Sequence, residues 1–187
     1  MNNISFNIIP GLESNDHEVR ILIDGSDFLG KDYLGIDPPV FFKQKTLFNS
    51  GELYIGRCTC GCEGCCDNYV TVRTDEDIIS WTNSGGLNIK FNKNDYENII
   101  YSAMHDYSWE DNKRTAERLV DEVFKEIITK DKYCFNWASA RIKENIITLS
   151  FSKRHEQKLF EFSWDGQSPE NAQIAAKKFT KKFIVVR

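Results

Sequence analysis

The chain lacks a long hydrophobic run, has only three histidines and contains none of the short motifs that mark the commonest active sites. No apolar stretch approaches the roughly 18 residues that a membrane helix needs, and the first residues lack the basic flank and apolar core of a secretory signal. A P-loop, a G-x-S-x-G nucleophile elbow and an H-E-x-x-H zinc motif are all missing. We therefore expect a cytoplasmic protein without a membrane anchor, we name no catalytic residue, and we favour a non-enzymatic function.

The chain also lacks an excess of basic residues. Its 187 residues include 24 Lys and Arg against 28 Asp and Glu, which gives a formal net charge of −4. A protein that neutralises nucleic-acid phosphates needs a basic footprint, so we expect no nucleic-acid partner. The charge is uneven, because residues 1–107 carry 16 acidic and 8 basic side chains whereas residues 108–187 carry 12 and 16. This difference in charge between the two halves could orient a protein partner. It is equally compatible with two ordinary solvent-exposed surfaces that have no partner.

Hydrophobic periodicity predicts an α+β fold in which antiparallel β meanders pack against about three main helices. The strand segments have a period of two, as in 69–73, where Val70 and Val72 share one face. The helical segments have apolar residues at i, i+3 and i+4. The expected strands span 19–23, 53–57, 69–73, 78–82, 87–91, 135–142, 146–151 and 159–164, and the expected main helices span 94–107, 116–128 and 169–183.

Two aspartates in the first 50 residues have the features of helix starts. Asp27 is expected to cap a short helix through Leu34, and Asp37 precedes Pro38, a residue that the first turn of a helix tolerates well. We expect this region to cover the edge of a sheet rather than to form a separate domain.

A short sequence repeat is compatible with a pseudo-duplication of a strands-then-helix unit, and it is also short enough to arise by chance. Ser108-Trp109-Glu110 and Ser163-Trp164-Asp165 each precede a segment with a helical apolar stripe. The corresponding halves are 1–107 and 108–187. No Pro- or Ser-rich linker separates them, so we expect one α+β domain over 1–187 with a shared core.

Five of the six cysteines fall within nine positions, 58–66, in the run R-C-T-C-G-C-E-G-C-C. Thiolates bind Zn²⁺ and other thiophilic ions, and a tetrahedral site needs four of them from a chain that can fold back on itself. Gly61 and Gly64 allow such a turn, and the neighbouring Arg57 could favour the thiolate form. The candidate zinc ligands are Cys58, Cys60, Cys62 and Cys65, with Cys66 in reserve.

Other interpretations of the cluster remain open. Structural zinc sites usually draw a second pair of ligands from a distant segment, and here only Cys134 or one of the histidines could add one. The cysteines could instead stay reduced as small residues of a tight hairpin, or two could form a disulfide, which the cytosol disfavours. One could also be the nucleophile of a thiol-dependent enzyme, although no motif selects a Cys–His pair. We expect Cys134 itself to be a core residue and His105 to be exposed.

Three stretches together resemble a known protein family: Ile21-Leu22-Ile23-Asp24-Gly25, Gly56-Arg57-Cys58-Thr59-Cys60-Gly61, and Ser108-Trp109-Glu110 leading into Arg114-Thr115-Ala116-Glu117-Arg118-Leu119. They are similar to a family of bacterial proteins of similar length for which no activity is established. The resemblance covers most of the chain, and the cysteine run with the Ser-Trp-Glu helix start is its most specific part. It implies a bacterial, cytoplasmic protein and assigns no catalytic residues.

The leading hypothesis for function is a non-enzymatic protein that binds or regulates a protein partner, as bacterial immunity proteins do, and it rests on the acidic composition and the charge polarity. A zinc-binding module at the cysteine cluster is the second hypothesis. A thiol-dependent enzyme is the third.

Overall fold

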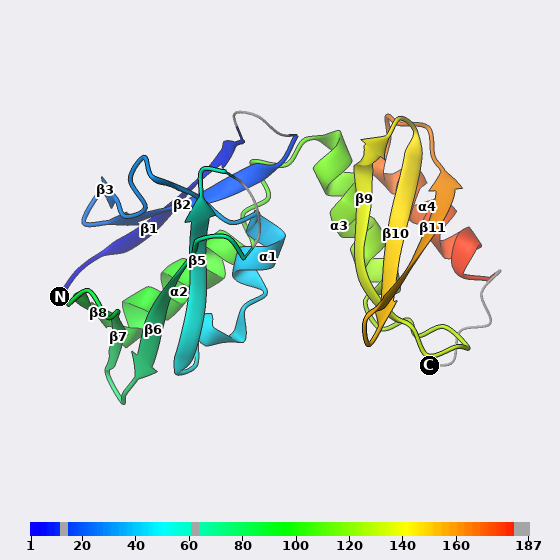
Figure 1. Ribbon diagram of the computed structural model, residues 1–187. Coiled ribbons are helices and arrows are strands. Elements are labelled where there is room, and N and C mark those ends of the chain that lie inside the picture. The colour runs from blue at the N-terminus through cyan, green and yellow to red at the C-terminus, as the bar shows by residue number, and fades with distance from the viewer. Residues whose placement is uncertain (12–14, 61–63, 182–187) are drawn as a thin grey trace. The chain divides into compact units, whose positions relative to one another are not determined.

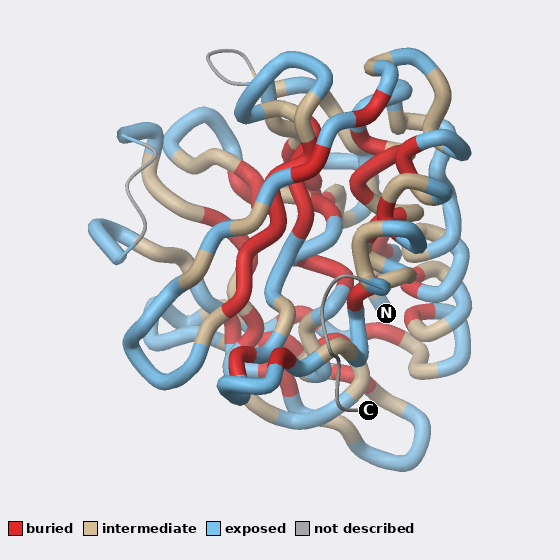
Figure 2. Tube along the Cα trace, turned by 90° about the vertical axis from the view of Figure 1, so that its right-hand side faces the viewer, coloured by how far each residue is buried: buried red, intermediate tan, exposed pale blue. Residues whose placement is uncertain are grey.

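The computed structural model describes residues 1–11, 15–60 and 64–181 (Figure 1). Within these residues it contains antiparallel sheets and four α-helices, of which three are 12 or 13 residues long. This confirms the α+β fold with antiparallel meanders and three main helices. Buried residues follow the strands and the inner faces of the helices, whereas most turns are exposed (Figure 2).

The chain divides into two compact units, Met1–Trp109 and Glu110–Arg187. The boundary lies two residues beyond the end of the expected half 1–107. Buried hydrophobic side chains form one cluster in the first unit and another in the second. The expectation of a single domain with a shared core stays a prediction, and each unit is described by itself.

The first unit contains a five-stranded antiparallel meander, in which each strand pairs with the next along the chain. Its strands are β4 (Tyr33–Leu34), β5 (Gly51–Cys58), β6 (Asp67–Thr74), β7 (Ile78–Thr82) and β8 (Asn88–Asn92). In β6, Val70 and Val72 are buried and Thr71 between them is exposed. The alternation of apolar and polar residues in the sequence therefore correctly predicts which face of this strand packs on the core.

A second sheet in this unit is three-stranded and antiparallel, with β2 in its centre. Its strands are β1 (Ile4–Pro10), β2 (His17–Ile23) and β3 (Ser26–Asp27). Asp24 and Gly25 have φ angles of 50° and 80° and form the two-residue turn between β2 and β3, which such dipeptides favour. Ile4 and Ile21 are buried in the same cluster as the meander, so this sheet completes the core of the first unit.

The expected helix from Asp27 to Leu34 is wrong. Asp27 lies in β3, and its carboxylate accepts a 2.6 Å hydrogen bond from the guanidinium of Arg20. The same guanidinium also donates to the carbonyls of Gly30 and Tyr33. The segment therefore wraps around a nearly buried arginine, and these tertiary hydrogen bonds outweigh the local capping preference of Asp27.

The helices of the first unit are α1 (Pro38–Phe42) and α2 (Lys93–Met104), with a 3₁₀ turn at Lys45–Leu47 between them. The helix start expected at Pro38 is confirmed. The N-cap of α2 is Asn92, whose side chain accepts a 3.1 Å hydrogen bond from the backbone N–H of Asp95. The helix therefore starts slightly earlier than expected, directly after β8.

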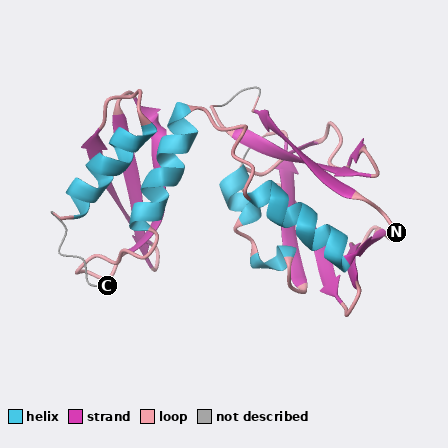
Figure 3. Ribbon diagram, turned by 180° about the vertical axis from the view of Figure 1, so that it is seen from behind, coloured by secondary structure: helices cyan, strands magenta, loops and turns pink. Residues whose placement is uncertain are grey.

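The second unit is a three-stranded antiparallel meander with two helices on one face (Figure 3). Its elements are α3 (Asn112–Phe124), β9 (Cys134–Lys143), β10 (Ile146–Lys153), β11 (Glu156–Ser163) and α4 (Pro169–Thr180). The central strand β10 buries Ile147, Leu149 and Phe151 in the cluster that the helices share. Helix α4 starts as expected, because the side chain of Ser168 accepts a hydrogen bond from the backbone N–H of Asn171.

Candidate metal centre

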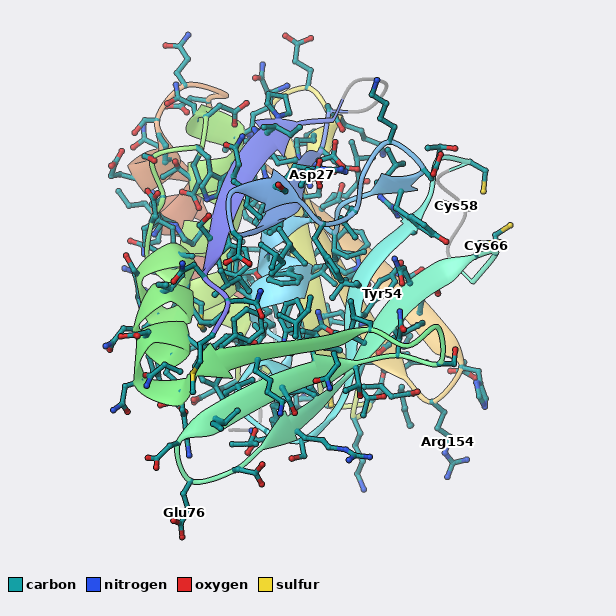
Figure 4. All side chains as sticks on the ribbon, turned by 90° about the vertical axis from the view of Figure 1, so that its left-hand side faces the viewer. Asp27, Tyr54, Cys58, Cys66, Glu76 and Arg154 are labelled. Carbon is teal, nitrogen blue, oxygen red and sulfur yellow. The ribbon has the colours of Figure 1, made fainter. Side chains whose placement is uncertain are left out.

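The cysteine cluster lies at the turn that joins β5 and β6, as the sequence indicates (Figure 4). Cys58 is the last residue of β5, and Cys66 directly precedes β6. The backbone N–H of Cys58 donates to the carbonyl oxygen of Cys66 at 3.2 Å. One step further into the sheet, Arg57 pairs with Asp67. The hairpin therefore brings the two ends of the cluster side by side.

The sulfur atoms of the cluster converge. The Sγ atoms of Cys58, Cys65 and Cys66 all lie within 4.8 Å of one another. A fourth sulfur, that of Cys60, lies 2.8 Å from the sulfur of Cys58 and so adjoins this group without belonging to it. A tetrahedral site with Zn–S bonds of about 2.3 Å places its sulfurs about 3.8 Å from one another. The sulfurs of Cys58, Cys65 and Cys66 are therefore close enough to one another to bind one ion, whereas the Cys58–Cys60 pair is closer than this spacing and has to open when an ion binds.

Three of the four predicted ligands, Cys58, Cys60 and Cys65, are brought together. Cys62 lies outside the described residues. Cys66, predicted as a reserve ligand, belongs to the convergent group. Over 1–11, 15–60 and 64–181, no other set of three or more His, Cys, Asp or Glu side chains has its ligand atoms so close together.

The backbone of the cysteine turn is shaped by Gly64 and Asp67. Gly64 has a φ of 77°, a conformation that glycine adopts without strain. Its backbone N–H lies 3.2 Å from each of the two carboxylate oxygens of Asp67. Cys65 and Cys66 lie between Gly64 and Asp67 in the sequence. The positions of these two cysteines therefore depend on the hydrogen bonds between the Asp67 side chain and the Gly64 backbone.

The described cysteines of the cluster are open to solvent and form no disulfide. Cys60, Cys65 and Cys66 are exposed, Cys58 is half-buried, and none of the described cysteines forms a disulfide. An ion can therefore reach the sulfurs from solvent without a change in the core of the unit.

Contacts between the sulfurs raise the pKa values of two thiols, those of Cys65 and Cys58. The pKa of Cys65 rises to about 12, mainly because its thiol is hydrogen-bonded to those of Cys60 and Cys58. The pKa of Cys58 is also raised, first of all by its hydrogen bond with Cys60. An activated cysteine nucleophile has a lowered pKa, which is the opposite of what these two residues show. A metal ion has to displace the protons, so its affinity should fall as the pH falls.

Two tyrosines contact the carboxylate that closes the turn. The hydroxyl of Tyr54, in β5, donates to Oδ1 of Asp67 at 3.2 Å, and the hydroxyl of Tyr69, in β6, donates to Oδ2 at 3.3 Å. The two rings stack with their centroids 5.1 Å apart. Burial, and then the neighbouring Asp67, raise the pKa of Tyr54 to about 12, so its hydroxyl remains a donor at neutral pH.

The sequence interpretation missed this role of Asp67 and of the tyrosines. One signal was present, because Asp67 and Tyr69 are two residues apart in a segment of period two and therefore share a face of the strand. The contribution of Tyr54 depends on the pairing of β5 with β6, in which Tyr54 lies opposite Tyr69.

Cys134 is exposed, which contradicts its expected place in the core. It is the first residue of β9 in the second unit, opposite Ser152. The next residue, Phe135, packs against the buried cluster instead. Because successive side chains of a strand point to opposite faces, the larger apolar residue takes the core side. His105 is exposed, as expected, and its Nδ1 lies 2.7 Å from the carbonyl of Tyr101.

No family model, curated protein or solved structure matches the chain. The bacterial family, the cytoplasmic location and the protein partner therefore stay predictions. Among the described residues, no helix combines the length and the apolar character that a membrane span requires. The convergent thiols are consequently the feature from which a function can be inferred.

Proposed function

We propose that the hairpin between β5 and β6 binds one thiophilic metal ion, with zinc as the ion expected in the cell. The observation that carries this is the convergence of the Cys58, Cys65 and Cys66 sulfurs within 4.8 Å, on two segments held together by a sheet. Cys60 is the fourth ligand, because its sulfur contacts that of Cys58. The proposed ligands are therefore Cys58, Cys60, Cys65 and Cys66, so Cys66 replaces Cys62 of the set that the sequence predicts.

A site of this kind binds a metal without catalysing a reaction at it. Four thiolates complete the tetrahedral coordination of Zn²⁺ and leave no open position for a water or a substrate. An all-sulfur donor set also selects soft ions such as Zn²⁺ and Cu(I) over Mg²⁺ and Ca²⁺. Binding requires reduced cysteines, which a cytoplasmic location would maintain. A regulatory role in binding a protein partner is compatible with such a module.

Metal content tests this proposal. The full chain is purified with reductant and without chelator, supplied with zinc and desalted. We expect about one equivalent of zinc per chain to remain, because the affinity of structural thiolate sites survives such a separation. Cys134→Ser removes an exposed cysteine of the second unit and should keep the same equivalent. Less than about a tenth of an equivalent in the unaltered protein would reject the site.

A further inference from the structure

We infer that Asp67 is a positioning residue for the metal site, whose carboxylate holds the Cys65–Cys66 turn in its metal-binding shape. The inference rests on the proposed function, since it assigns a role in that same site. Asp67 lies directly beside a ligand in sequence, yet the group of ligand atoms within 4.8 Å of one another contains three sulfurs and no carboxylate oxygen. Its oxygens are instead engaged by donors of the protein.

The first part of this role concerns the turn itself. Both oxygens of Asp67 accept from the backbone N–H of Gly64 at 3.2 Å. The carboxylate therefore spans the two intervening residues, Cys65 and Cys66. Both are proposed ligands, so a displacement of the carboxylate moves half of the ligand set.

The second part concerns what holds the carboxylate. Tyr54 comes from β5 and Tyr69 from β6, and each donates to a different oxygen of Asp67. The stacked rings restrict each other, with an angle of 30° between their planes. Asp67 is thus fixed to both strands of the hairpin. Three donors on one carboxylate tie the exposed turn to the sheet.

The consequence is preorganisation. A loop that must be ordered when a ligand binds loses affinity, because fixing each backbone residue costs conformational entropy. Groups that orient metal ligands through hydrogen bonds typically change metal affinity by about 10- to 100-fold when they are replaced. We expect a loss in this range when Asp67 is altered, while the ligands themselves remain the same.

The experiment compares Asp67→Asn and Tyr54→Phe with Glu76→Gln as the matched control. Glu76→Gln also removes one negative charge, but Glu76 lies in the turn at the opposite end of β6 and points away from the cysteines (Figure 4). The dissociation constant for Zn²⁺ is measured by competition with a chromophoric chelator, and the site is also titrated with Co²⁺. Thermal unfolding of the metal-free proteins is recorded alongside.

We expect Asp67→Asn to raise the dissociation constant about 10- to 100-fold, and Tyr54→Phe to raise it by less. Glu76→Gln should leave it within about twofold, because charges at that distance are largely screened. At saturating Co²⁺ every variant should show the same tetrahedral thiolate absorption, since the four sulfurs are unchanged. The metal-free Asp67→Asn and Tyr54→Phe proteins should still unfold cooperatively, at temperatures within a few degrees of the unaltered chain, which separates positioning from a general loss of structure.

The outcomes distinguish the inference from the proposed function. Unchanged zinc affinity in Asp67→Asn, with binding in the unaltered protein, would overturn the positioning role and leave the metal site standing. An altered Co²⁺ spectrum in Asp67→Asn would make Asp67 a ligand and would also overturn it. Absence of zinc binding in the unaltered protein would reject both. If Asp67→Asn does not fold, the test rests on Tyr54→Phe alone. A zinc affinity of Tyr54→Phe equal to that of the unaltered chain would then contradict the positioning role of Asp67.

Discussion

Replacing Cys65 and Cys66 together by serine should lower the affinity for zinc by at least about a thousandfold. Structural zinc sites derive roughly 10–16 kcal/mol from their ligands, and this variant removes two of four. The sulfurs of Cys65 and Cys66 are exposed, so the change leaves the buried cluster of the first unit intact. Competition with a chromophoric chelator measures the effect, and Cys134→Ser is the control.

Single substitutions then separate the two possible sets of ligands. Cys66→Ser should weaken zinc binding, because Cys66 belongs to the convergent group. Cys62→Ser should retain one equivalent with little change in affinity. The reverse pattern would favour the set derived from the sequence, in which Cys62 is a ligand and Cys66 is the reserve. Zinc affinity of the Cys65→Ser/Cys66→Ser protein within about tenfold of the unaltered chain would contradict any site at this turn.

Replacing Glu117 by alanine should destabilise the second unit by about 3–5 kcal/mol, the cost of removing one partner of a buried ion pair. Glu117 lies on α3, and its side chain is 9% exposed. It forms ion pairs with Arg114 at 3.1 Å and with Arg141 at 2.9 Å. It also accepts from the hydroxyl of Ser139 and from the backbone N–H of Ala140, both on β9.

The size of this effect follows from burial. The Arg114 side chain is only 3% exposed, so the substitution removes the Glu117 carboxylate from beside a charge in a region of low dielectric constant. The N–H of Ala140 also loses its acceptor, since β9 is an edge strand of the sheet. The substitution therefore removes the hydrogen bonds that join α3 to β9 at Ser139 and Ala140, and the bond from Ala138 to Asp121 remains.

Calorimetric unfolding of the full chain measures this effect, with Glu122→Ala as the control. Glu122 lies on the same helix and forms an ion pair with Lys125, but both side chains are more than half exposed. Exposed pairs contribute little, so the control should change stability by less than about 1 kcal/mol. Equal effects of the two substitutions would show that the Glu117 network does not stabilise the unit.

Local patterns were sufficient to predict most of the elements. The strand Ile78–Thr82 has the predicted bounds, because its ends are set by adjacent turns and its faces by a period of two. Helix α4 begins where a capping serine precedes a proline at Ser168 and Pro169. Such signals act within a few residues and do not require knowledge of the neighbouring elements.

The errors arose where distant residues decide the conformation. Aspartate is a residue type that often caps helices, but the carboxylate of Asp27 accepts a hydrogen bond from Arg20 instead. Cys134 has the hydrophobicity of a core residue, but the face of β9 on which it lies is set by how Phe135 packs. Both outcomes depend on tertiary contacts, which outweigh preferences of at most about 1 kcal/mol.

The candidate site was partly predictable for the same reason. Five cysteines within nine positions are visible in the sequence and place the metal site at the hairpin turn. The choice of Cys66 and the role of Asp67 depend on the register of β5 and β6, which shifts between Tyr54 and Gly56. A register shift of this kind changes the direction of the side chains that follow it, and a simple alternation along the strand does not predict that change.

X-ray absorption at the zinc edge of the zinc-loaded protein tests the metal site most directly. It counts the atoms around the ion and measures their distances without depending on any variant. We expect about four sulfur neighbours at about 2.3 Å and no nitrogen or oxygen ligand. A shell with two or fewer sulfurs, completed by nitrogen or oxygen, would contradict a four-cysteine site on this hairpin.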